Sequence, residues 1–190
     1  MRILMLGNSF IFTNDLPKIL ADLTGAEVVQ HTRGGARLSE QLNPATALGA
    51  CTQAALATER WDYVVLQGMS HGPITAPKSF FSSVARLCAQ IRANGAVPVL
   101  YATWPYEKGG AALTKKGWDY DEMARGLQEA YHRAAEKNNA LLADVGERFC
   151  ALCTTQQLYA ADGVHPNEQG TRVAAETIAA VILQHREGQT

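Results

Sequence analysis

Apolar residues recur along this chain in two alternating patterns. Short, nearly continuous apolar runs predict buried strands at 2–6, 26–32, 62–67, 97–104 and 140–145. Apolar residues at helical spacing predict helices at 15–25, 43–60, 80–95, 119–138 and 168–186. Strands that alternate with helices and lack polar alternation are typical of a parallel sheet covered on both faces. We therefore predict an α/β fold, a three-layer α/β/α sandwich around a five-stranded parallel sheet.

The ends of the predicted helices carry familiar signals. Asp15 or Asn14 can cap the first helix, and Gly25 can end it. Asn43 is the predicted cap of the second helix, with a proline in the first helical position, and Gly95 follows the third helix as a stop.

Length and composition narrow the class of protein. The chain has 190 residues, which fits one domain over 1–190. Hydrophobic residues make up 47% and charged residues 18%, and the formal net charge is -1 without a basic stripe. These values argue against nucleic acid or an anionic membrane as a partner, and a small-molecule substrate is the expected one. The oligomeric state stays open.

The distribution of apolar residues also bears on location. No apolar segment is long enough to span a bilayer, and the apolar start at 2–6 is too short for a signal peptide. As the chain is written we expect a cytoplasmic protein, although a leader removed earlier would leave the same start.

The four cysteines predict neither a disulfide framework nor a metal site. Cys51 and Cys88 are isolated within helical patterns, which favours core packing. Cys150 and Cys153 form a C-x-x-C that would suit a redox pair or half a zinc site. No second pair or nearby histidine completes a metal set, so two small apolar residues on one short helix are the favoured interpretation.

In parallel sheets of this kind, ligands bind beyond the carboxyl ends of the strands. Five loops lie there, and the longest, "PYEKGGAALTKKGW", is the expected mobile flap. The five loops are 7–14, 33–38, 68–76, 104–118 and 144–166.

Candidate chemistry begins in the first of these loops. Ser9 follows the first strand, and Gly7 permits a tight turn there. A serine in this position is a nucleophile only if a base serves it, and otherwise a helix cap or turn residue.

The last of these loops contains a candidate base, although the same residues would also suit a polar loop at the entry to a helix. In "DGVHPN", Asp162 and His165 lie three residues apart, so the carboxylate can hold one ring nitrogen and leave the other free to accept the serine proton. A third element is Gly34-Gly35 after the second strand, where a backbone N–H can face a developing oxyanion.

Together these motifs resemble the SGNH hydrolases, also called GDSL-like lipases and acylhydrolases, over the whole chain. "LGNSF", "RGGARL" and "DGVHPNEQG" are similar to the first, second and last blocks of that family. The resemblance implies a flavodoxin-like α/β/α sandwich, a Ser9–His165–Asp162 triad, and an oxyanion hole that includes the amides of Ser9 and Gly35. It implies no metal and no organic cofactor.

The third block departs from the family pattern of Gly-x-Asn-Asp. The matching stretch is "LQGMSHG", with Ser70 where the family has its oxyanion asparagine. Gln67 or Ser70 could supply the third donor, and loss of one such donor typically costs about 100- to 1,000-fold in turnover.

Several residues near these motifs could form the substrate pocket. They are Asn8 beside the serine, His71 in the third loop, and the aromatic residues Trp104 and Tyr106 after the fourth strand. His31 could also line the pocket, whereas His132 and His185 are expected on the surface. Aromatic rings at this place can stack on a sugar or flank a short acyl group, or can simply pack the loop.

The sequence therefore predicts a serine esterase for carboxylic esters, with short or acetyl groups, possibly on a carbohydrate. Thioesters and lysophospholipids are the nearest enzymatic alternatives. A nucleotide- or flavin-binding module and a non-catalytic binder of acylated ligands are alternatives from other classes.

Overall fold

A computed structural model describes residues 1–189. Within them a five-stranded parallel sheet has the strand order β2-β1-β3-β4-β5. The strands are β1 (Arg2–Gly7), β2 (Glu27–Thr32), β3 (Tyr63–Leu66), β4 (Val97–Tyr101) and β5 (Leu141–Ala143). The predicted fold class and all five strands are confirmed, although β4 and β5 are shorter than expected.

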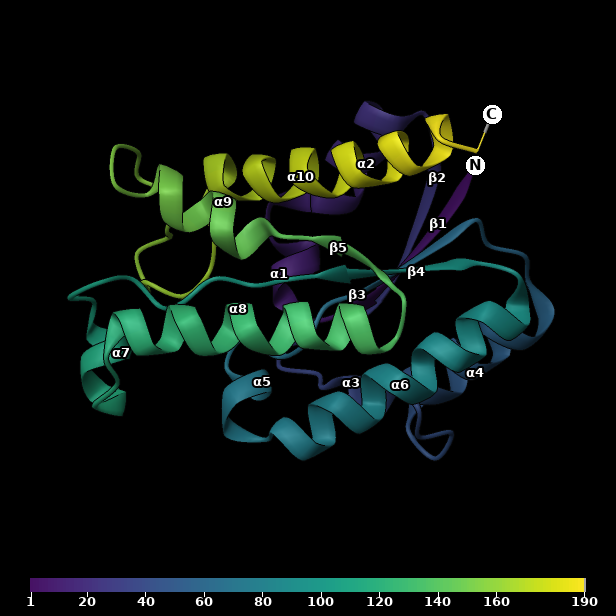
Figure 1. Ribbon diagram of the computed structural model, residues 1–190, viewed down its shortest axis with the longest axis horizontal. Coiled ribbons are helices and arrows are strands. Elements are labelled where there is room, and N and C mark those ends of the chain that lie inside the picture. The colour runs from purple at the N-terminus through teal and green to yellow at the C-terminus, as the bar shows by residue number, and fades with distance from the viewer. Residues whose placement is uncertain (190) are drawn as a thin grey trace.

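Helices cover both faces of the sheet (Figure 1). One face carries α1 (Ser9–Phe12), α2 (Leu16–Thr24), α9 (Val145–Leu152) and α10 (Glu168–Glu187). The other face carries α3 (Leu38–Gln41), α4 (Ala47–Thr58), α6 (Pro77–Asn94) and α8 (Tyr120–Lys137). The segments η1 (Thr13–Asp15), α5 (Gly72–Thr75) and α7 (Ala111–Lys116) are single turns or little more. None of the helices in residues 1–189 is both long and apolar enough to cross a bilayer.

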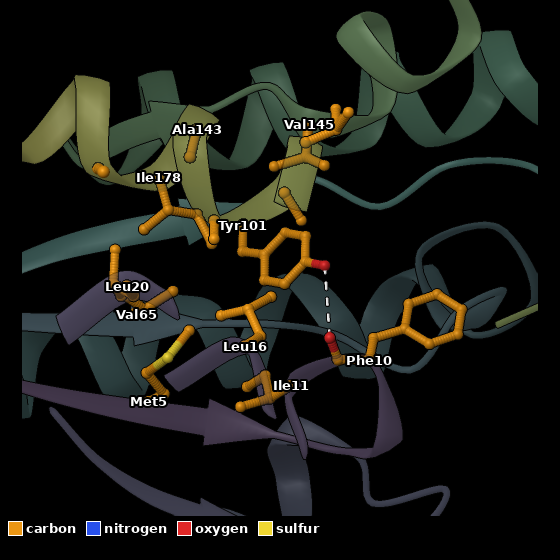
Figure 2. Close-up of a cluster of buried hydrophobic side chains, with 14 of the residues drawn as sticks. Met5, Phe10, Ile11, Leu16, Leu20, Val65, Tyr101, Ala143, Val145 and Ile178 are labelled. Carbon is orange, nitrogen blue, oxygen red and sulfur yellow. Dashed lines mark hydrogen bonds between the residues drawn. The ribbon is translucent and has the colours of Figure 1, made fainter. Parts of the chain in front are cut away.

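Alternate residues of each strand enter two separate cores. Met5, Val65 and Tyr101 pack with α1, α2, α9 and α10, where the Tyr101 hydroxyl donates to the Phe10 carbonyl at 3.5 Å (Figure 2). Leu4 and Leu66 point the other way, against α3, α4, α6 and α8. Continuous apolar strands are the sequence signature of a sheet buried in this way.

Two predicted helix caps are wrong. Helix α4 begins at Ala47 with Thr46 as its cap, whose hydroxyl accepts the Gly49 amide at 3.0 Å. Asn43 instead accepts the Ala45 amide in the preceding turn. Asp15 does precede the first residue of α2, as predicted, but neither it nor Asn14 makes a capping hydrogen bond with its side chain, and both have left-handed backbone conformations with φ of 56° and 53°. The predicted ends at Gly25 and Gly95 are confirmed.

The cysteines only partly follow the sequence interpretation. Cys88 is fully buried in the core between the sheet and α6, but Cys51 is exposed on α4. The helical period is compatible with either placement, since α4 is apolar nearly all round. Cys150 and Cys153 lie at the end of α9, both partly buried and both reduced. Residues 1–189 contain no group of three ligands suited to a metal ion.

Candidate active site

Ser9 is the first residue of α1, directly beyond the carboxyl end of β1. Its position depends on Gly7, where a Cβ atom would lie 2.5 Å from Gln67 Oε1 and 2.7 Å from Ile11 Cδ1. A side chain at position 7 would therefore push the first loop away from the sheet. Asn8 begins the turn by accepting the Phe10 amide on Oδ1 at 3.2 Å.

The structure brings Ser9 and the last loop together. The Ser9 hydroxyl lies 2.8 Å from His165 Nε2, and His165 Nδ1 lies 2.6 Å from Asp162 Oδ2. An ionised carboxylate only accepts hydrogen bonds, so the ring carries its proton on Nδ1 and leaves Nε2 as the acceptor for the serine hydroxyl. The three side chains thus form one hydrogen-bond chain between residues 156 positions apart.

Asp162 is held in its charged form. Partial burial raises the pKa of the Asp162 carboxyl, but the hydrogen bonds from His165 Nδ1 and from the amides of Val164 and His165 outweigh it, so this pKa lies below its ordinary value. The two amides donate to Asp162 Oδ1 at 3.0 and 2.9 Å. The carboxylate can therefore orient the imidazole and stabilise its protonated form.

The backbone amides of Ser9 and Gly35 are the two predicted oxyanion donors from the main chain. The Ile11 amide donates to Asn8 O and the Phe10 amide to Asn8 Oδ1, which within the described residues leaves the Ser9 amide unused. Gly35, with φ of 67°, follows Gly34 in an exposed turn closed by the Ala36 amide and the Arg33 carbonyl. This is the region where a type II turn requires glycine.

Both candidates for the third oxyanion donor already have partners. Gln67 is fully buried, accepts the Asn8 amide at 3.0 Å and donates to the Gly68 carbonyl. The Ser70 hydroxyl is 3.1 Å from the Tyr106 hydroxyl. Gln67 therefore supports the backbone beside Ser9, and which of Gln67 and Ser70 faces an oxyanion stays a prediction.

Asn8 does not line a pocket as the sequence interpretation proposed. The residue is 3% exposed, and Nδ2 donates to the carbonyls of Ala36 at 3.1 Å and Gly68 at 3.5 Å. Asn8 thus links the loop that carries Ser9, the nucleophile loop (7–14), to the loops after β2 and β3. These two loops flank it because β2 and β3 lie on either side of β1.

Trp104 does not line a substrate pocket either, contrary to the prediction from the sequence. It is fully buried, stacked between Phe10 at 4.7 Å and Phe149 at 4.2 Å, and its indole N–H donates to the Val164 carbonyl at 3.2 Å. The chain after β4 stays buried up to Tyr106 and carries Trp104 into the core. The ring is therefore unavailable to substrate.

Aromatic residues do gather around His71, in the loop after β3. His71 contacts the rings of Tyr106 at 6.4 Å and Trp118 at 5.4 Å, and its Nδ1 lies 2.8 Å from the Thr75 hydroxyl. Burial, followed by the charges of Lys116 and Arg37, lowers the pKa of His71. His71 is thus a neutral ring at neutral pH, with two cations nearby.

A small cavity of about 20 Å³ lies between the loops after β2 and β3. Arg37 and Leu38 form one side, and Gly68 and Met69 form the other, with Phe80 between α6 and the sheet. Since Asn8 bonds the residues next to Arg37 and to Met69, this cavity adjoins the nucleophile loop.

The remaining histidines do not join Ser9. His31 packs beside α4, with Nδ1 3.1 Å from the Thr52 hydroxyl. His132 is half exposed and pairs with Asp144. His185 lies against Tyr63 at the amino end of β3, so it is a packed residue rather than a solvated one.

Sequence reasoning missed two residues that support the site. Phe10 contacts the His165 ring edge-on at 5.4 Å. The buried Tyr131 hydroxyl accepts the Gly68 amide at 3.1 Å, and burial raises its pKa to about 12. The helical period of 119–138 could have placed Tyr131 on the buried face, but no local signal indicates its partner.

Comparison with known proteins shows the family of this chain. The model of the GDSL-like lipase/acylhydrolase family matches residues 7–173, which include Ser9, Asp162 and His165. The chain belongs to this family. It is therefore a hydrolase-family protein, as its motifs predicted. None of the curated proteins matches it.

Solved structures agree with the family. A protein from Slackia heliotrinireducens, provisionally assigned to the SGNH hydrolases, is 53% identical, with a TM-score of 0.92 over 96% of this chain and 98% of that one. An α/β hydrolase from the metagenome of Lake Arreo shares the fold at 17% identity, with a TM-score of 0.72 over 95% and 94% of the two chains. A catalytic mutant of an acetylxylan esterase from Geobacillus stearothermophilus does so at 14% identity, with a TM-score of 0.65 over 95% and 93%.

Proposed function

We propose that this family member is a serine esterase that hydrolyses carboxylic esters through an acyl-enzyme on Ser9. The observation that carries the proposal is the hydrogen-bond chain from the Ser9 hydroxyl through His165 to Asp162, at 2.8 and 2.6 Å. Nucleophile, base and orienting carboxylate within hydrogen-bond reach are the arrangement that activates a serine.

The first half-reaction forms the acyl-enzyme. Ser9 Oγ attacks the carbonyl carbon of the ester while His165 Nε2 takes the hydroxyl proton. The tetrahedral intermediate then breaks its bond to the alcohol oxygen, which leaves with the proton returned by His165. Asp162 stays ionised throughout and holds the imidazole on Nδ1.

The second half-reaction uses water in place of the serine. His165 accepts a proton from water, whose oxygen attacks the acyl carbon, and the Ser9–acyl bond then breaks with the proton returned to Ser9 Oγ. In both steps the negative oxygen faces the amides of Ser9 and Gly35, with Gln67 or Ser70 as the third donor.

Short acyl groups, acetyl above all, are the proposed substrates. The cavity of about 20 Å³ beside the nucleophile loop is too small for a long chain and suits a group no larger than an acetyl methyl. The acetylxylan esterase among the structural neighbours favours an acetylated carbohydrate, by analogy of fold alone.

A fluorophosphonate probe tests the proposal directly. We expect one covalent adduct on the wild type, measured by intact mass, and none on Ser9→Ala. Ser82→Ala, an exposed serine on α6, serves as the matched control and should label like the wild type. Full labelling of Ser9→Ala would place the nucleophile elsewhere, and a folded wild type that takes no probe would favour a non-catalytic binder.

An ester series then tests the substrate class. Turnover of 4-nitrophenyl acetate, butyrate and octanoate should fall with chain length, and acetylated xylo-oligosaccharides should release acetate. Faster turnover of the octanoate ester would contradict the short-acyl proposal while leaving the esterase proposal intact.

A further inference from the structure

The base of this site lies on a segment without regular secondary structure. Residues 153–167, between α9 and α10, contain a single bridge from Tyr159 to Pro166. The side chains of Asp162 and His165 are 50% and 34% exposed, so side-chain packing alone does not fix them. Their positions must come from whatever holds the backbone around them.

Three consecutive carbonyls at His165 are held by three donors from different places. The Val164 carbonyl accepts the Trp104 indole N–H at 3.2 Å. The His165 carbonyl accepts the Ala160 amide at 2.8 Å. The Pro166 carbonyl accepts the Asn14 side-chain amide at 3.0 Å. Only the middle donor belongs to the loop itself.

Trp104 is a rigid donor. Its ring is fully buried in a three-ring stack, within 6° of parallel to both Phe10 and Phe149. Phe10 follows Ser9 in the chain and also contacts the His165 ring at 5.4 Å. The same stack therefore touches the neighbour of the nucleophile and the backbone beside the base.

Asn14 is held at the cost of backbone strain. It is one of two adjacent non-glycine residues with left-handed conformations, a combination that L-residues rarely adopt. Its side chain does not cap α2 but donates twice, to the Pro166 carbonyl and to the buried Thr171 hydroxyl at 2.9 Å. This strained turn continues the segment that begins with Ser9.

We propose that Asn14 and Trp104 are positioning residues that set the distance between Ser9 and His165. Each side chain donates a hydrogen bond to the backbone carbonyl of a residue next to His165. Asn14 lies on the segment that begins with Ser9, and Trp104 stacks on Phe10, the residue after Ser9. The proposal rests on the proposed esterase function, because it is His165 acting as the base that needs the placement. Errors of about 1 Å in such a geometry can cost about 100-fold in rate.

Asn14→Gly tests the first residue, with Asn139→Gly as its matched control. Asn139 is the other asparagine with a positive φ in residues 1–189, at 45°, in the turn between α8 and β5. Glycine relieves the left-handed backbone equally at both positions, so the difference between the variants isolates the side-chain amide. We expect Asn14→Gly to lower kcat for 4-nitrophenyl acetate about 10- to 100-fold at an unchanged KM, and Asn139→Gly to leave both constants unchanged.

Trp104→Phe tests the second residue, with Trp61→Phe as its control. Phenylalanine keeps a flat ring in the stack but removes the N–H. The Trp61 indole makes an equivalent bond to the Ala55 carbonyl at 3.2 Å, away from the site. We expect Trp104→Phe to lower kcat about tenfold, the value of one lost hydrogen bond of about 1.4 kcal/mol, with no change for Trp61→Phe.

The rate of fluorophosphonate labelling separates the two proposals. If the wild type is labelled and both variants label at the wild-type rate, the positioning roles are wrong and the esterase proposal stands. If the folded wild type is not labelled, the esterase proposal fails first. A lower thermal midpoint with unchanged kcat and labelling rate below that midpoint would indicate a merely structural role and would also overturn the inference.

Discussion

Two segments border the proposed active site, and they differ in what they pack against. The catalytic loop (157–167) buries Leu158 and Tyr159 in the main core, and its carbonyls accept hydrogen bonds from Trp104 and Asn14. The flap segment (107–118) contains α7, whose Leu113 packs into a small separate cluster with Tyr106, Met123 and Leu127. The two segments also meet, because the Glu107 amide donates to the Gly163 carbonyl at 2.8 Å. We expect the catalytic loop, which is anchored in the main core, to tolerate replacement less than the flap segment does.

The largest expected effect comes from the catalytic loop. Asp162→Asn keeps the shape of the side chain but presents an amide to His165 Nδ1, which favours the wrong tautomer. We expect kcat to fall about 10,000-fold, measured with 4-nitrophenyl acetate. No single replacement in the flap segment should cost more than about tenfold, since none of its residues belongs to the hydrogen-bond chain.

The same variant has a distinct dependence of stability on pH. Because the folded state lowers the pKa of Asp162, ionisation of this group stabilises the fold at pH values above about 3.9, its ordinary value. That contribution is lost as pH falls through the lowered pKa. The difference in free energy of unfolding between wild type and Asp162→Asn, from urea titrations, should therefore shrink between pH 7 and pH 3. A difference that grows on acidification would contradict the assigned direction.

A pair of glycines gives a matched test of the two segments. Gly163 and Gly117 both have φ of 65°, one between the two catalytic side chains and the other at the end of α7. A Cβ atom at Gly163 would lie 3.1 Å from Glu107 Oε2, whereas at Gly117 it would meet nothing within 4 Å. Alanine at either position should cost about 1–2 kcal/mol of stability through its left-handed backbone.

The two replacements should differ in activity. Gly163→Ala should lower kcat about 10- to 100-fold, since a shift there moves Asp162 and His165 relative to Ser9. Gly117→Ala should leave kcat unchanged. Equal kcat values for the two variants would mean that activity depends no more on the backbone of the catalytic loop than on that of the flap segment.

The sequence predicts what depends on local pattern. The strands, the main helices and the serine and histidine motifs follow from apolar spacing and short-range chemistry, and the fold confirms the first two. Asn14 and Trp104 were assigned a cap and a substrate contact, because their actual acceptors lie 152 and 60 residues away in sequence. When a side chain donates to a carbonyl that is distant in sequence, the residues around it in the sequence do not predict that hydrogen bond. Cys51 was predicted to be buried and is exposed. The sequence of α4 has no clear apolar face, so helical spacing does not show which of its residues face solvent.

The smallest expected effect concerns charge on the substrate side. Arg37 is exposed at the cavity beside the nucleophile loop, and Lys116 lies 5.2 Å from the Trp118 ring next to His71. Burial lowers the pKa of His71, and the charges of Lys116 and Arg37 lower it further, so we expect both cations to attract an anion bound beside His71. We expect an ester with a carboxylate, 4-nitrophenyl hemisuccinate, to have a lower KM than 4-nitrophenyl butyrate, which has the same chain length without the charge. Arg37→Gln and Lys116→Gln should each raise the KM of the anionic ester about two- to fivefold, the range of an exposed charge pair, and leave the butyrate ester unchanged.

Added salt and a distant lysine complete this test. Raising the ionic strength should weaken the preference for the charged ester in the wild type and have little effect in the double variant, because exposed charges are screened. Lys137→Gln, at the end of α8 on the opposite edge of the sheet, should change neither KM. If the hemisuccinate ester shows no advantage at low salt, the two cations do not select substrate, and the contrast between the segments reduces to the placement of the base.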